Sequence, residues 1–334
     1  MSERVVEHLN AALHALMRSD ERVYFIGEDV LDPYGGAFKV ARRLSTDFPG
    51  RVISTPISEL GLAGVANGLA LAGQRPIAEF MFGDFIFLAA DQIINFAAKT
   101  VTMYGERVAH PVLFRCPVGG HRGYGPTHSQ SVQKHFIGVA NLDLYELSAL
   151  HDLHAHLPRI FDRGNPAILF ESKTLYAQPM LPGEDVDELF RREWLDADKL
   201  TALLSIEEEA QAVIITTGGM FPLCHQAARR LFFEFEIEVQ IVVPFQLYPF
   251  DPASLMPRLH SSTPVFIVEE GTAGGTWGSE VALTLRRGNP AFRGPIELIH
   301  SADSIIPSAR HLESEVLVQP QDIVSRVAGL VLGE

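Results

Sequence analysis

Short apolar strands alternate with helical segments along almost the whole chain, and this alternation constrains the fold more than any other feature. Helices are expected between the strands, including an amphipathic one at 4–18 and an alanine- and glycine-rich one at 59–73. The pattern predicts an α/β fold with two domains, each a mainly parallel sheet flanked by helices. The runs of apolar residues that predict the strands are 23–27, 51–55, 76–80, 111–117, 143–148, 167–172, 212–219, 239–245, 264–271 and 296–303.

The alternation is interrupted between 181 and 209, where prolines and many charged residues occur together. A chain of 334 residues has room for two domains of ordinary size. We therefore expect a first domain at 1–180, a linker at 181–209 and a smaller second domain at 210–334. In the first domain, the segment 84–105 is apolar on nearly all sides, which predicts a buried helix.

Composition excludes several classes of protein. The chain has 27 Lys and Arg against 41 Asp and Glu, so its net charge of −14 argues against binding to nucleic acid. Its two cysteines, Cys116 and Cys224, form no CxxC pair, which argues against a disulfide framework and fits a reducing cytoplasm. The first residues do not resemble a signal peptide, and the apolar stretch at 59–73 is shorter than the roughly 20 residues that cross a bilayer. We expect a cytoplasmic protein that makes no membrane contact.

Several motifs occur in a fixed order that is far more specific than any one of them alone. They are GEDV, GGAFKV, STPISELGLAGVANGLALAGQRPIAEFMFGDFIFLAADQIINFAAK, RCPVGGHRGYGPTHSQS, NPAILFESKTLY and VEEGTAGGTWGSEVA. Together they resemble the beta subunits of thiamine-diphosphate-dependent 2-oxo acid dehydrogenases of the pyruvate, branched-chain and acetoin types. The resemblance runs from about residue 20 to the C-terminus. It implies a transketolase-like pyrimidine-binding domain and a transketolase C-terminal domain that mainly supports assembly.

The resemblance also implies a partner. Two beta chains usually join two alpha chains in an alpha2beta2 heterotetramer, with thiamine diphosphate between an alpha and a beta chain. The diphosphate and its Mg²⁺ are normally held by a GDG motif, which does not occur here; the nearest string, Gly83-Asp84-Phe85, matches another family motif. Because Mg²⁺ still needs oxygen ligands, they are expected from the alpha subunit.

Glu59, in TPISELG at an expected helix start, matches the family's glutamate that hydrogen-bonds to N1′ of the cofactor's aminopyrimidine. That bond allows the cofactor's own 4′-imino group to remove the C2 proton. The residue pattern by itself also fits a purely structural role, in which the acid at the helix N-terminus interacts with the helix dipole.

Three apolar residues complete the expected cofactor pocket. Phe85 matches the aromatic residue that stacks on the aminopyrimidine, and Ile57 and Met81 match neighbours that line the same pocket. Apolar residues such as these are more commonly ordinary residues of the hydrophobic core, so their assignment to the cofactor pocket rests on the resemblance.

His128, in GPTHSQS, lies in a glycine-rich loop, where the backbone can adopt unusual conformations near a ligand. The resemblance places this histidine near the reacting centre, in substrate binding or in acyl transfer. Histidine exchanges protons near neutral pH, as both steps require. His121 and Arg122, in the same loop, are candidates to meet the substrate carboxylate.

Metal binding by this chain is a weaker prediction. His151 and His154 can share a helix face, but His156 points elsewhere and no carboxylate completes a set, so we interpret the segment as an ordinary helix. Family members often bind K⁺ through backbone carbonyls near RIFDRGNP (159–166), which leaves a K⁺ site open.

Three functions remain open from sequence. The first is decarboxylation of a 2-oxo acid, pyruvate or branched-chain, with acyl transfer to the lipoyl domain of an acyltransferase. The second is a related enzyme that delivers its two-carbon unit to a non-lipoyl acceptor, because FIGVANLDLYELSALHD (136–152) departs from the family pattern. The third is a non-catalytic assembly subunit, which the joint presence of Glu59, Phe85 and His128 argues against.

Overall fold

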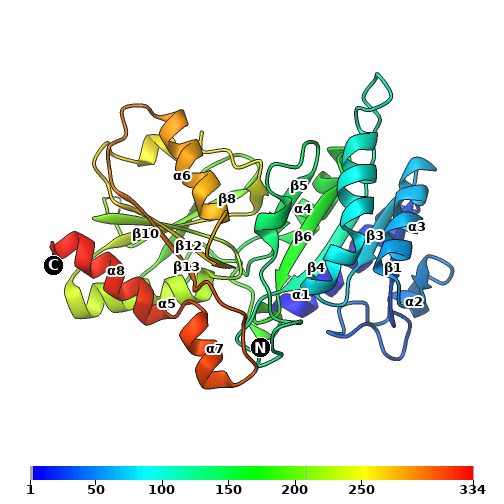
Figure 1. The fold of residues 1–334 in the computed structure, drawn as a ribbon, viewed down its shortest axis with the longest axis horizontal. Coiled ribbons are helices and arrows are strands. Elements are labelled where there is room, and N and C mark those ends of the chain that lie inside the picture. Colours follow the sequence, from blue (N-terminus) through cyan, green and yellow to red (C-terminus); the bar gives the residue numbers. More distant parts are fainter. Residues whose placement is uncertain (1–2, 208, 334) are drawn as a thin grey trace. The chain divides into compact units, whose positions relative to one another are not determined.

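The computed structural model describes residues 3–207 and 209–333, which form two compact units (Figure 1). Unit 1 contains residues up to 118 together with 136–145 and 151–180. Unit 2 contains 119–135, 146–150 and the residues from 181 onward. The segment that carries His128 thus clusters with unit 2, although it lies between two strands of the unit 1 sheet in sequence.

The sheet of unit 1 is parallel at each of its described strand pairs. Its strands follow the order β5-β6-β4-β3-β1-β2. The pairs β1–β2, β1–β3, β3–β4 and β4–β6 all run in the same direction, as the strand–helix alternation predicts. The strands are β1 (Val23–Gly27), β2 (Val52–Ser54), β3 (Arg75–Glu79), β4 (Leu113–Val118), β5 (Asp143–Glu146) and β6 (Ala167–Ser172).

Helices of unit 1 follow the predicted pattern closely. The opening helix packs Leu9, Leu13 and Leu16 into the core, which confirms the prediction that it is amphipathic. The helices are α1 (Val5–Ser19), α2 (Leu44–Asp47), α3 (Glu59–Leu71), η1 (Gly83–Ala89), η2 (Gln92–Ala98), α4 (Leu153–Asp162) and η4 (Leu175–Ala177), with η3 (Gln133–Phe136) between β4 and β5.

The prediction of one buried helix at 84–105 is wrong in two respects. The segment changes pitch, from the 3-10 helix η1 to the π-helix η2. It also buries only one side, with Ile86 and Ile93 inside, while Phe87 and Leu88 are 38% and 62% exposed. An apolar pattern on all sides predicts burial but does not say whether the same chain or another one provides it.

The sheet of unit 2 has the order β13-β12-β9-β10-β8-β7. The pairs β9–β10, β9–β12 and β12–β13 are parallel, whereas β8 pairs antiparallel with both β10 and β7. The two antiparallel strands come from the stretch 181–209, which therefore contributes to this sheet. The strands are β7 (Arg191–Trp194), β8 (Thr201–Ser205), β9 (Ala212–Thr216), β10 (Val239–Pro244), β12 (Val265–Thr272) and β13 (Ile296–Ser301), and β11 (Gln246–Tyr248) follows β10.

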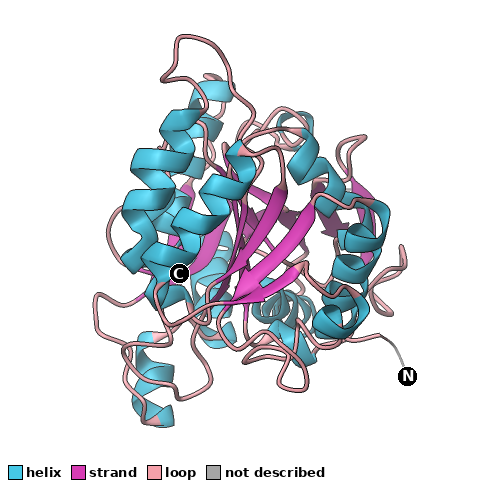
Figure 2. Ribbon diagram, turned by 90° about the vertical axis from the view of Figure 1, so that its right-hand side faces the viewer, coloured by secondary structure: helices cyan, strands magenta, loops and turns pink. Residues whose placement is uncertain are grey.

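Helices cover the core of unit 2. Helices α5 and α8 lie side by side (Figure 1) and bury Leu231, Val324 and Val327. Figure 2 shows helices and loops around the strands. Among residues 3–207 and 209–333, no helix combines the length and the apolar character that a bilayer-spanning segment needs. The helices of this unit are α5 (Phe221–Phe235), η5 (Met256–Arg258), α6 (Trp277–Gly288), α7 (Arg310–Val316) and α8 (Pro320–Leu332).

Candidate active site

Glu59 is the first residue of α3, just beyond the end of β2. The helix starts here because Ser58 caps it: its Oγ accepts the N–H of Gly61 at 3.2 Å. The Glu59 side chain is buried, with 6% exposure, whereas its neighbours Ile57 and Leu60 are 84% and 49% exposed. A buried carboxyl group thus lies directly beside an apolar surface that this chain does not cover.

Glu28 is a second buried carboxyl group at the same edge of the sheet. It directly follows β1, and its Oε1 accepts the backbone N–H of Ser58 at 3.2 Å. Burial raises the pKa of Glu28, and the negative charge of Glu59 raises it further. Sequence reasoning did not single out Glu28, although its place after a parallel strand, where ligand-binding residues gather, was a usable signal.

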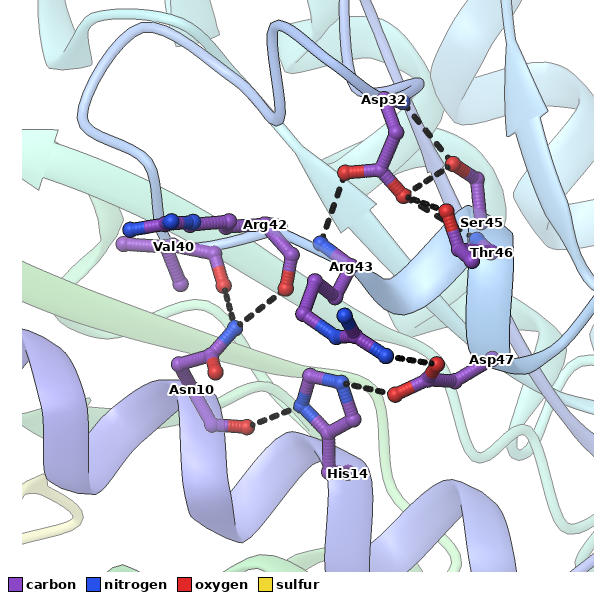
Figure 3. A network of polar contacts seen from close by, with 9 residues as sticks. All are labelled: Asn10, His14, Asp32, Val40, Arg42, Arg43, Ser45, Thr46 and Asp47. Atoms are coloured by element: carbon purple, nitrogen blue, oxygen red, sulfur yellow. Dashed lines mark hydrogen bonds and ion pairs between the residues drawn. The ribbon is translucent and has the colours of Figure 1, made fainter.

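The loop after Glu28 is held by the carboxylate of Asp32 (Figure 3). That carboxylate accepts the backbone N–H groups of Arg43 and Thr46 at 2.7 and 3.0 Å. It also accepts the hydroxyls of Ser45 and Thr46 at 2.8 and 2.7 Å. Burial would raise the pKa of Asp32, but the hydrogen bonds from Thr46, Arg43 and Ser45 outweigh it and lower the pKa to about 2.

Helix α1 holds the same loop from its other side (Figure 3). The side-chain amide of Asn10 donates to the carbonyls of Val40 and Arg42 at 2.6 and 3.0 Å. His14 accompanies it, with Nε2 3.4 Å from the carboxylate of Asp47. The GEDV and GGAFKV motifs are therefore parts of one anchored loop that begins at Glu28.

A buried ionic network lies between the strands below this edge. The guanidinium of Arg115 on β4 donates to both carboxylate oxygens of Glu171 on β6, at 2.7 and 2.5 Å. It also donates to Glu79 on β3, and Tyr176 donates its hydroxyl to Glu171 at 2.7 Å. Because a buried charge is costly without partners, this mutual pairing fixes the three strands relative to one another.

Phe85 and Met81 lie near the start of η1, and both are half-buried. The ring of Phe85 packs edge-on against Phe82 with centroids 5.8 Å apart, and Phe82 packs against Phe38 at 5.5 Å. Gly83 allows this arrangement, because a Cβ there would lie 2.7 Å from the Val118 side chain. The helix that carries Phe85 can therefore lie directly against β4.

His128 lies in unit 2, and the other four predicted site residues lie in unit 1. The hydroxyl of Thr127 is 2.8 Å from Nδ1 of His128, and the backbone N–H of His128 donates to the carbonyl of Gly125 at 3.3 Å. Both ends of the residue, backbone and ring, are therefore held within the loop.

The expected K⁺ site falls at 159–166, which comprises the end of α4 and the turn after it. The carbonyl of Arg163 accepts from the guanidinium of Arg107 at 3.3 Å, and that of Gly164 accepts from the N–H of His110 at 2.9 Å. The carbonyl of Pro166 accepts from Asp143 at 3.0 Å. These three carbonyls thus have protein donors, and a K⁺ site here stays a prediction.

The histidines near α4 form two separate pairs. His154 packs against His8 with ring centroids 5.1 Å apart, whereas His151 packs against His156 at 5.8 Å. Across the part of the chain that the structure describes, no three His, Cys, Asp or Glu residues gather as a metal site would require.

Comparison with known proteins shows that the chain is made of two transketolase-like domains. Residues 4–179 match the family model of the transketolase pyrimidine-binding domain, and residues 202–323 match that of the transketolase C-terminal domain. A solved split-gene transketolase, described as an inactive beta4 tetramer, superposes with a TM-score of 0.72 at 20% identity over 99% of each chain. A Pichia stipitis transketolase superposes with a TM-score of 0.71 at 16% identity, over 99% of this chain and 46% of its own. At these identities the structures show the fold.

Curated relatives narrow the class. The pyruvate dehydrogenase E1 component subunit beta of Dictyostelium discoideum is 32% identical, covering 96% of this chain and 89% of its own length. Those of Leifsonia xyli and Rickettsia felis are 31% and 30% identical and cover 97% and 98% of this chain, and 93% and 98% of their own lengths. The chain belongs to this family, the beta subunits of thiamine-diphosphate-dependent 2-oxo acid dehydrogenases.

Proposed function

We propose that this chain supplies the aminopyrimidine half of a thiamine diphosphate site, and that an alpha subunit supplies the other half. The observation that carries the proposal is the contrast at the start of α3. Glu59 is buried by its own chain, yet the adjacent Ile57 is 84% exposed. An apolar residue expected to line a pocket is left open here, as it would be if a second chain completed that pocket.

Glu59 would act on the cofactor before any substrate arrives. Its carboxyl group would hydrogen-bond to N1′ of the aminopyrimidine, and the bound cofactor would supply the nucleophilic carbon and the electron sink for decarboxylation. Glu28 lies at the same edge of the sheet, where burial and the charge of Glu59 raise its pKa. Phe85 would stack on the aminopyrimidine, and Met81 and Ile57 would line the same pocket.

His128 would act later, in substrate binding or in the departure of the acyl group. The contact with Thr127 engages Nδ1, so proton exchange with the substrate would fall to Nε2. The diphosphate and Mg²⁺ would be held by the alpha subunit, since the GDG motif is absent from this sequence.

The reaction that this arrangement supports is oxidative decarboxylation of a 2-oxo acid, followed by acyl transfer to a lipoyl domain. Pyruvate is the first substrate to test, because the relatives of this chain are named for it. Reconstitution with the matching alpha subunit should release carbon dioxide from pyruvate or a branched-chain 2-oxo acid and acylate an added lipoyl domain. Carbon dioxide release without acylation would point to another acceptor, and no release from any 2-oxo acid would contradict the proposal.

A further inference from the structure

The segment Gly119–Ser131, called the glycine loop below, carries His128 and has a defined conformation. Its ends meet where the N–H of Gly119 donates to the carbonyl of Gln130 at 3.1 Å. Gly119, Gly123 and Gly125 all have positive φ, so the loop is built from conformations that an isolated glycine-rich chain adopts only part of the time.

Glu270, on β12, ties both ends of the glycine loop to one carboxylate. Its Oε1 accepts the backbone N–H of Gly120 and the hydroxyl of Ser131, each at 2.8 Å. Its Oε2 lies 3.5 Å from Nε2 of His121. Gly120 and Ser131 lie eleven positions apart in sequence, so one side chain of the second sheet closes the loop.

Glu313, on α7, holds the middle of the glycine loop. Its Oε2 and Oε1 accept the backbone N–H of Gly123 at 3.1 and 3.3 Å, and its side chain is only 3% exposed. The loop also lies close to the end of this helix, since a Cβ on Gly120 would be 2.4 Å from the side chain of Leu317, which directly follows α7.

We propose that Glu270 and Glu313 are positioning residues that hold the glycine loop, and with it His128, in the shape used for catalysis. The proposal rests on the function proposed above for His128. By fixing the loop before substrate binds, the two carboxylates remove an ordering cost that the reaction would otherwise include. The second domain would then contribute to the reaction itself, beyond the assembly role that the family resemblance implies.

The first test measures the loop directly. Hydrogen–deuterium exchange on the assembled complex should show the amides of Gly120 and Gly123 exchanging on the order of 10-fold faster in Glu270→Ala and Glu313→Ala. Glu315→Ala is a matched control, because Glu315 is exposed on the same helix as Glu313. Unchanged exchange in both variants would contradict the proposal.

The second test connects the loop to turnover through His128. Glu270→Ala and Glu313→Ala should lower kcat about 10-fold or more while leaving exchange of the cofactor's C2 proton unchanged. Glu270→Gln keeps an acceptor oxygen, so its kcat should fall less than that of Glu270→Ala. If the carboxylates act through His128, adding His128→Ala to either variant should lower kcat no further than His128→Ala alone.

The outcomes separate this inference from the proposed function. Fully additive losses, or a loosened loop with normal turnover, would contradict the positioning role alone. A wild-type complex that decarboxylates no 2-oxo acid would instead contradict the proposed function, and the exchange rates would still report whether the two carboxylates hold the loop.

Discussion

The carboxyl group of Glu146 accepts the side-chain amide of Gln133 at 2.7 Å, and both side chains are buried in unit 2. Its other oxygen accepts the backbone N–H of Gly219 at 2.7 Å. Burial raises the pKa of Glu146 to about 7, against the lowering effect of these hydrogen bonds and one from Thr217, and the charge of Glu270 adds to the rise.

Glu146 makes the stability of unit 2 depend on pH. In the folded chain it keeps its proton up to about pH 7, whereas in the unfolded chain it loses the proton near 4.5. Its contribution is therefore complete below the unfolded pKa and is lost as pH rises through the folded pKa, by roughly 3 kcal/mol in all. Urea unfolding followed by tryptophan fluorescence reports on unit 2, because Trp194 and Trp277 both lie there.

Glu146→Gln should remove this contribution. Between about pH 5 and 8 the parent's free energy of unfolding should fall relative to that of the variant, because groups with shifted pKa values such as Glu269 and His225 titrate in both proteins. Glu315→Gln, at an exposed position, should behave as the parent does. An equal pH dependence in the parent and in Glu146→Gln would contradict the assignment.

Glu59→Gln tests the role of the buried carboxyl group at the start of α3. The substitution keeps the shape of the side chain but removes the proton that the carboxyl group exchanges. The rate of exchange of the C2 proton of bound cofactor should therefore fall by about 10²-fold or more. Exchange is followed by NMR after quenching the assembled enzyme. Glu106→Gln, exposed in the same unit, is the control. Equal rates in Glu59→Gln and the parent would remove Glu59 from the mechanism.

His128→Ala should separate early from late steps. The variant should assemble and exchange the C2 proton normally, but lose turnover with the lipoyl domain because the proton for the departing acyl group is missing. An artificial electron acceptor bypasses that transfer. Rescue by this acceptor would assign His128 to acyl transfer, and loss with both would assign it to substrate binding or decarboxylation. Full activity with both, as expected for the exposed control His260→Ala, would show that His128 is only a loop residue.

The sheets were predictable because strands and helices carry distinct hydrophobic periods. The predicted strands of unit 1 agree with the structure to within two residues, and those at 23–27 and 167–172 agree at both ends. Strands β7 and β8 were not predicted. Arg191–Trp194 is charged and half-exposed at a sheet edge, so it lacks the apolar signal of a central strand.

The candidate site was only partly visible in the sequence. Ordered motifs predict Glu59, Phe85 and His128, which stay predictions, whereas no role is predicted for Glu28, Glu270 or Glu313. The last two act through hydrogen bonds to residues about 150 and 190 positions away, and no local pattern records such a pairing. The sequence likewise does not predict that Ile57 is exposed beside the buried Glu59. It shows that a residue is apolar but not which chain covers it.

The measurement that tests the split site most directly is the binding of thiamine diphosphate, with Mg²⁺, by titration calorimetry. The isolated chain should bind the cofactor weakly, with Ile57 left exposed and no motif of its own for the diphosphate. Adding the alpha subunit should produce tight binding, and Glu59→Gln should weaken C2 exchange far more than it weakens this binding. Tight binding of the cofactor by the isolated chain would contradict the proposal that the site is shared.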